Sequence, residues 1–234
     1  MSGVLVNVFA IIFGGSIGLI LNRGLNERVK KVIMQGVGLS VIIIGIAGAL
    51  TIKSPILMVV SLVVGGLIGS LIQIESRLDR LGKRIERTFK NDNNGFAKGF
   101  VWATLIYCVG AMAIVGSLEA GLNGDNTTLY IKAILDGVTA IIFAATLGFG
   151  VIFSSISVFI YQGAIVLLGY QIEPYLTEHL INEVSAIGSV LIMAIGINIL
   201  EIKHIHVGDL LPAIIIPAIY FLALNVYAFV IGVL

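Results

Sequence analysis

The sequence has few charged side chains for its length, and this scarcity indicates the class of protein. Charged residues make up 12% of the 234 residues, whereas hydrophobic residues make up 58%. A soluble domain is typically about 25% charged. Eight membrane-crossing segments of about 20 residues each would use about 160 residues and leave too few for a separate globular domain. We therefore predict an all-α membrane protein with about eight transmembrane helices, forming a single polytopic domain over residues 1–234.

Cysteine, histidine and basic residues are also scarce. The single cysteine, Cys108, excludes an internal disulfide framework and a thiolate metal cluster. Of the three histidines, His204 and His206 flank Ile205 in a loop, where we expect solvated side chains rather than metal ligands. The formal net charge of +1 gives no basic excess that would indicate nucleic acid as a partner. We expect neither a metal site nor another cofactor.

Motifs of membrane-embedded enzymes are missing as well. The sequence contains no HExxH and no Walker loop, and no histidine falls within an expected span. Enzymes usually need paired acids, a metal cluster or an activated nucleophile. We therefore do not expect an enzyme.

Apolar runs predict eight spans. They cover roughly residues 3–22, 32–51, 55–74, 99–117, 129–148, 150–169, 181–200 and 211–233. No basic residue precedes the first run, so we expect it to stay in the membrane rather than to be cleaved as a signal peptide. Spans five and six are separated only by residues 147–150, which predicts either a very short glycine turn or a broken, re-entrant segment.

The basic residues indicate an orientation. Twelve of the 14 lysines and arginines lie in the odd-numbered loops, and only Lys53 and Lys132 lie on the opposite side. The positive-inside rule then predicts a multi-pass protein of the bacterial plasma (inner) membrane with both termini outside. The one long loop, residues 75–95, has apolar residues at helical spacing opposite basic ones. It predicts a cytoplasmic amphipathic helix, which either lies on the lipid surface or extends span three.

Spans one to three and spans six to eight share a weak pattern. At an offset of 150 residues, five positions between 35 and 53 match identically, including Gly38 with Gly188 and Lys53 with Lys203. The two sets run in opposite directions through the membrane. They are therefore consistent with a three-helix inverted repeat around spans four and five, a design common among transporters.

Polar side chains inside the spans are the candidate binding residues, because burying them in lipid is costly. Asp136 and Lys132 lie four residues apart on one face of span five. The pair is either structural or part of a cation or proton site. Asn7, Gln162 and Asn198 bring amides into spans one, six and seven, as interhelical hydrogen bonds or as a polar lining. Glu183, at the start of span seven, is favoured as an interfacial acid over a ligand.

Stretches along nearly the whole chain carry a family resemblance. They are Asn7, Gly14-Gly15, Gly65, Gly69, Tyr107-Cys108-Val109-Gly110-Ala111-Met112, Gly121 to Asp125, Lys132, Leu135-Asp136-Gly137, Leu147-Gly148, Ser154, Tyr161-Gln162-Gly163, Ser185-Ala186-Ile187-Gly188, Gly196 and Leu211-Pro212-Ala213. With these residues the chain resembles the bacterial inner-membrane family of unknown function that includes the YqgA-like and YdfK-like proteins. The resemblance implies a multi-pass inner-membrane protein described as a candidate transporter, with no established substrate or site residues.

These observations favour a secondary transporter or channel-like permease. Its partners would be the lipid bilayer and a small solute or ion, with proton or sodium coupling as candidates. The alternative is a non-transporting scaffold or sensor subunit, whose small-residue helix faces would serve as oligomer contacts. A homo-oligomer is compatible with either interpretation.

Overall fold

The fold is built from helices joined by short connections. The structure, a computed structural model, describes residues 1–24, 26–88 and 96–231, and the regular elements in these ranges are all helical. In chain order they are α1 (Ser2–Gly24), α2 (Glu27–Ala49), α3 (Pro55–Ile72), α4 (Ile74–Thr88), α5 (Phe96–Cys108), α6 (Ala111–Leu122), α7 (Thr127–Leu147), α8 (Gly150–Ile172), η1 (Glu173–Tyr175), α9 (Glu178–Ile199), α10 (Val207–Leu210), η2 (Leu211–Ile214) and α11 (Ile216–Ile231).

Membrane-crossing segments make up most of the chain. Seven helical segments are long and apolar enough to cross a membrane, and α5 with α6 passes the same test as one bent span. The predicted all-α membrane protein is thereby confirmed, with seven to eight helical segments that can span a membrane where about eight were expected. The three-helix inverted repeat is not confirmed and stays a prediction.

The predicted fourth span, residues 99–117, is bent rather than straight. The span is divided into α5 and α6, which meet at an angle of 61°. Gly110 lies at the break with φ 136° and ψ 148°, a backbone conformation that is essentially restricted to glycine. A helix cannot continue through these angles, so the chain bends inside the span.

The connection between spans five and six is a tight turn between two full helices. Gly148 ends α7 with φ 79° and ψ −156°, and α8 begins at Gly150. Only a residue without a Cβ adopts such angles readily. The structure therefore favours the short turn over a re-entrant segment.

The last span is interrupted near its start. It passes from α10 through η2 into α11, and Pro217 falls in the first turn of α11. Proline has no backbone N–H and cannot bond to the carbonyl four residues earlier, so a regular α-helix begins only there. Residues 232–234, at the end of the predicted span 211–233, lie outside the described residues.

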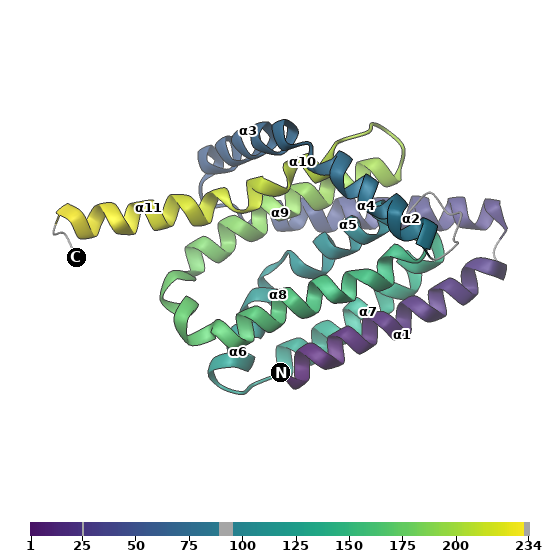
Figure 1. The fold of residues 1–234 in the computed structure, drawn as a ribbon, viewed down its shortest axis with the longest axis horizontal. Helices are drawn as coiled ribbons and strands as arrows, with labels where there is room; N and C mark the ends of the chain where they lie inside the picture. The colour runs from purple at the N-terminus through teal and green to yellow at the C-terminus, as the bar shows by residue number, and fades with distance from the viewer. Residues whose placement is uncertain (25, 89–95, 232–234) are drawn as a thin grey trace.

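Two groups of helices surround the core. In Figure 1, α1, α7 and α8 lie along the lower part of the molecule, α3 and α11 along the upper part, and α9 between them. α9 is the central helix, since 72% of its apolar stretch is buried compared with 17% for α2.

α1 and α7 pack in unusually close contact. A Cβ atom on Gly14 would overlap the carbonyl oxygen of Gly137 in α7. Small residues at such positions let helix backbones approach where lipid offers no hydrophobic drive for association. The close approach also brings Asn7, seven residues before Gly14 in α1, into contact with Asp136 of α7.

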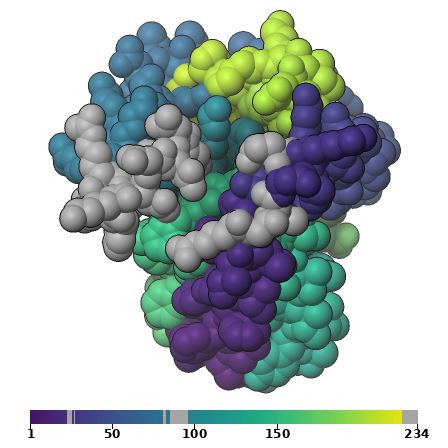
Figure 2. Space-filling view, turned by 90° about the vertical axis from the view of Figure 1, so that its right-hand side faces the viewer, coloured from purple at the N-terminus to yellow at the C-terminus, as the bar shows by residue number. Residues whose placement is uncertain are grey.

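The predicted amphipathic segment contains a helix, α4, that runs from Ile74 to Thr88. α4 follows α3 directly after Gln73, whose φ of 56° turns the chain into a new direction. Residues 89–95 of the predicted segment lie outside the described residues. Figure 2 looks onto the end of the molecule where α4 lies, with the yellow-green residues near position 205 at the top of this face.

Candidate functional site

A buried ion pair on α7 forms the centre of the candidate site. The Lys132 Nζ atom lies 3.0 Å from Asp136 Oδ1 and 2.9 Å from Oδ2, so the ammonium bridges both carboxylate oxygens. The two residues are 7% and 5% exposed. Their spacing of four residues places them on one face of the helix, as predicted. Two charges held away from water need compensating partners, and here Lys132 and Asp136 compensate each other.

The amide of Asn7 joins three helices at this pair. Its Nδ2 donates to Asp136 Oδ2 at 3.0 Å and to Gln162 Oε1 at 3.3 Å. Asn7 comes from α1, Asp136 from α7 and Gln162 from α8, and both amide side chains are fully buried. The structure thus brings together four of the six residues proposed from the sequence.

Two polar atoms of this cluster have no partner among the described residues. They are the Oδ1 atom of Asn7 and the Nε2 atom of Gln162, one acceptor and one donor. Reversing the Asn7 amide would point its oxygen at the Asp136 carboxylate, so the network fixes its orientation. Buried polar groups are normally satisfied, and an unpaired donor and an unpaired acceptor in one cluster suit a small polar ligand or a bound water.

The break in span four lies close to the same cluster. Tyr107 and Cys108 end α5, and both are near enough to Asp136 to interact with it electrostatically. The buried Tyr107 hydroxyl lies beside Thr139 without meeting the geometry of a hydrogen bond. Interrupted helices carry backbone groups that the helix does not satisfy, and inside a membrane these are tolerated only against protein or a cavity.

Tyr107, Cys108 and Thr139 were missed as site residues. Only the Val109-Gly110 step signalled a break in the sequence, and it resembles many other glycine steps in a chain with 28 glycines. The proximity of Tyr107 to Asp136 depends on how α5 packs against α7, which a local sequence pattern does not predict.

Glu183 lies away from the cluster and binds backbone. Its Oε1 accepts the N–H groups of Lys53 at 3.1 Å and Ser54 at 2.7 Å, where α2 turns into α3. His179 Nε2 lies 3.3 Å from the same oxygen. Glu183 is fully buried, so it fixes the α2–α3 turn from the side of α9.

Asn198 is at the opposite end of α9 and holds a loop. Its Nδ2 donates to the carbonyl of Ile205 at 2.8 Å, and its Oδ1 accepts the Ile205 N–H at 2.7 Å. These two bonds satisfy the backbone of Ile205 as a neighbouring strand would. Asn198 therefore does not share a site with Asp136.

Removing one charge of the buried pair should destabilise the protein more than removing both. We predict that Lys132→Met costs about 3–5 kcal/mol, because it leaves Asp136 buried without a counter-charge. Adding Asp136→Leu should recover most of that loss. The measurement is unfolding of the detergent-solubilised protein by heat or denaturant.

The chain offers a matched control in α4. Lys83 and Asp79 form the same four-residue pairing at 2.7 Å, but their side chains are 60% and 49% exposed. Lys83→Met should cost at most about 1 kcal/mol, because exposed pairs contribute little. Equal losses for Lys132→Met and Lys83→Met would contradict the assignment of a buried pair.

Comparisons with known proteins agree on the family. The chain is 34% identical over 232 residues to the "Uncharacterized membrane protein YdfK" of Bacillus subtilis (strain 168), covering 97% of this chain and 98% of that protein. It is 29% identical over 219 residues to the "Uncharacterized protein YqgA" of Escherichia coli (strain K12), covering 92% and 93%. No solved structure matches. A family model described as "Protein of unknown function (DUF554)" matches residues 2–222, and the chain therefore belongs to the DUF554 family of membrane proteins.

Proposed function

We propose that the protein is a secondary transporter or channel-like permease that moves a small solute or ion across the bacterial inner membrane. The observation that carries this proposal is the buried cluster of Lys132, Asp136, Asn7 and Gln162, which contains an unpaired acceptor and an unpaired donor. A purely structural network tends to satisfy its buried members, because each unpaired atom is costly. Unpaired atoms beside a charged pair instead suit a ligand that binds and leaves.

Asp136 is the proposed site of the coupling ion or proton. Its carboxylate is held by Lys132 Nζ and Asn7 Nδ2, and a cation or proton arriving at Asp136 would compete with both donors. Such competition frees the ammonium and the amide and weakens the bonds that hold α1 against α7. Asn7 and Gln162 would then serve as the polar lining of the solute path. Asn198 and Glu183 are not assigned to this path, since they bind backbone elsewhere.

The broken span offers a movable element beside this site. α5 and α6 are joined only through Val109 and Gly110, so one half can change its angle without disrupting the helix of the other. Discontinuous helices next to a buried polar site are a recurrent feature of transporters. We propose that rearrangement at Gly110 accompanies opening of the site.

A non-transporting scaffold or sensor subunit is the second candidate. It is favoured by the mutual satisfaction of Lys132 and Asp136 and by the close packing of α1 on α7. In this case the pair would be structural and no small ligand would bind. We propose no enzymatic activity, because the sequence contains no HExxH and no Walker loop, and no histidine falls within an expected span.

Both termini are proposed to lie outside. The positive-inside rule supports this orientation, because twelve of the 14 basic residues fall in the odd-numbered loops. In a Cys108→Ala background, a cysteine at Asp125 should react with a membrane-impermeant thiol reagent added to intact cells. A cysteine at Lys203 should react only after permeabilisation. The reverse pattern would contradict the orientation.

Ligand binding at Asp136 can be tested by thermal shift. Purified protein is heated with sodium, lithium, potassium, protons or a panel of small metabolites, beside the Asp136→Asn variant. A ligand at about 100 times its dissociation constant should stabilise the folded protein by about 2.7 kcal/mol. We expect a saturable shift that disappears in Asp136→Asn, and loss of coupled uptake of that ligand by the variant in proteoliposomes.

The exposed Asp79 provides the control for this experiment. Asp79→Asn removes a carboxylate of α4 and should leave the shift and the uptake unchanged. Uptake by Asp136→Asn equal to that of the unaltered protein would remove Asp136 from the transport site. A folded protein that responds to no ligand would favour the scaffold.

A further inference from the structure

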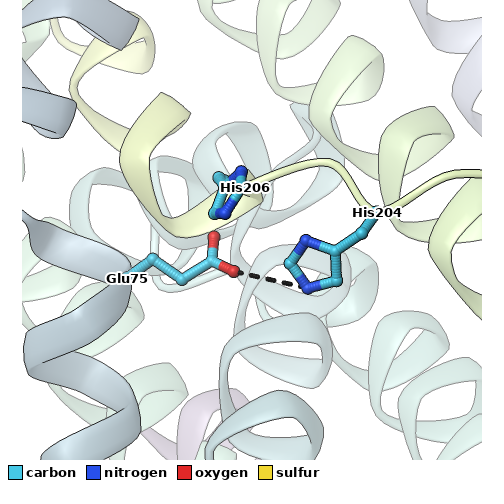
Figure 3. Close-up of side chains that lie close together, drawn as sticks. All are labelled: Glu75, His204 and His206. Atoms are coloured by element: carbon cyan, nitrogen blue, oxygen red, sulfur yellow. Dashed lines mark ion pairs between the residues drawn. The ribbon is translucent and has the colours of Figure 1, made fainter.

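Three side chains of types that bind metal ions meet where α4 approaches the loop between α9 and α10. Figure 3 shows Glu75, His204 and His206 with their side chains turned toward one another. One ligand atom from each residue lies within 4.8 Å of those of the other two. Glu75 comes from the first turn of α4, and the histidines from the loop between α9 and α10, so the chain brings distant segments together.

Hydrogen bonds to the backbone hold this loop in place. Asn198 binds both the N–H and the carbonyl of Ile205, at 2.7 and 2.8 Å. Ile205 lies between the two histidines, so bonds that fix its backbone also fix the backbone positions from which both histidine side chains extend. The spacing of His204 and His206 is weak evidence by itself, whereas their attachment to Asn198 gives them a defined position.

Glu75 is held by a second set of bonds. One carboxylate oxygen, Oε2, accepts the N–H of Gly208 at 3.1 Å, and the Glu75 N–H donates to Asp209 Oδ1 at 2.9 Å. The other oxygen, Oε1, faces the histidines. Such outer contacts orient a metal ligand and are typical of metal sites in proteins.

The imidazoles are not engaged in hydrogen bonds with other described residues. His204 Nε2 lies 3.8 Å from Glu75 Oε1, which is too long for a hydrogen bond. The ring centroids of His204 and His206 are 4.9 Å apart and nearly perpendicular. Ligand atoms of both rings therefore remain available beside a carboxylate oxygen.

Space for an ion and its remaining ligands is present. A cavity of about 290 Å³ is lined by these three residues together with Asp79, Trp102 and Asn198, among others. The histidines are exposed and Glu75 is half-buried, so an ion can enter from solvent. The positive-inside rule assigns this end to the cytoplasm.

We propose that Glu75, His204 and His206 bind a divalent transition-metal ion, with zinc as the representative. Two imidazoles and one carboxylate form a ligand set that zinc and its neighbours prefer, and they leave further positions for water or another ligand. Ligand atoms around zinc lie about 3.4 Å apart when each bond is about 2.0–2.2 Å long. The observed distances between the three ligand atoms reach up to 4.8 Å. Rotation of the exposed histidine side chains would shorten them to the distances found around zinc.

A bound ion would link α4 to the α9–α10 loop. Glu75 lies two residues after the left-handed turn at Gln73, and His206 directly precedes α10. The ion would thereby fix the direction of α4 relative to the end of α9. This proposal does not rest on the transport proposal, because the two sites share no residue.

The test is titration of the purified full-length protein with zinc or cobalt, without a polyhistidine tag. We expect one ion per chain, with a cobalt absorption spectrum that reports nitrogen and oxygen ligation. Glu75→Gln, His204→Asn and His206→Asn should each weaken binding by at least about 100-fold, because loss of an outer contact alone costs about 10- to 100-fold. Asn198→Ala should weaken it by about 10- to 100-fold, as a positioning residue.

Two controls separate this site from adventitious binding. His179→Asn removes the third histidine, which lies at the other end of α9, and Lys203→Gln changes the loop without removing a ligand. Both should bind the ion as the unaltered protein does. Melting curves without metal show whether each variant is folded. The proposal is overturned if no saturable binding of one ion occurs, or if the three ligand variants bind with unchanged affinity.

Discussion

The ion pair between Lys132 and Asp136 is the interaction on which the arrangement of α1, α7 and α8 depends. Two buried charges are stable only when each is paired and hydrogen-bonded. Lys132 covers both oxygens of Asp136, and Asn7 supplies a further donor from α1. Gly14, about two turns further along the same face of α1, permits the close contact with the backbone of α7 that brings Asn7 within reach of Asp136. Electrostatics and close packing therefore require one another here.

Glu183, a second buried acidic side chain, has different partners. Glu183 has no lysine or arginine partner among the described residues and is instead held by two backbone N–H groups of the α2–α3 turn. Its bonds tie a loop to the central helix through backbone groups and leave its own Oε2 unpaired, whereas the network around Asp136 connects side chains of three helices. This contrast is the physical reason for placing ligand binding at Asp136 and a structural role at Glu183.

Local patterns in the sequence predicted much of the fold but only part of the site. Apolar runs located the spans, and the four-residue spacing of Lys132 and Asp136 predicted their pairing. The meeting of Asn7 and Gln162 could not be predicted, because it depends on α1 and α8 packing on the same side of α7. The break at Gly110 was missed because its backbone angles, not its identity, distinguish it from other glycines. The proximity of Glu75 and His204 could not be predicted from the sequence either, because it depends on tertiary contacts between distant segments.

The most direct test of the transport site uses Cys108, the single cysteine, which ends α5 at the break and lies near Lys132 and Asp136. The measurement is the modification of Cys108 by a small, charged, impermeant thiol reagent in intact cells and in inverted membrane vesicles, with denatured protein as the reference for full reaction. If the polar cluster is a site that opens to water, the thiol should be modified from at least one side, more slowly when a ligand occupies Asp136. If Cys108 reacts from neither side in folded protein, yet reacts fully once denatured, the cluster is a sealed structural pair and the transport site lies elsewhere.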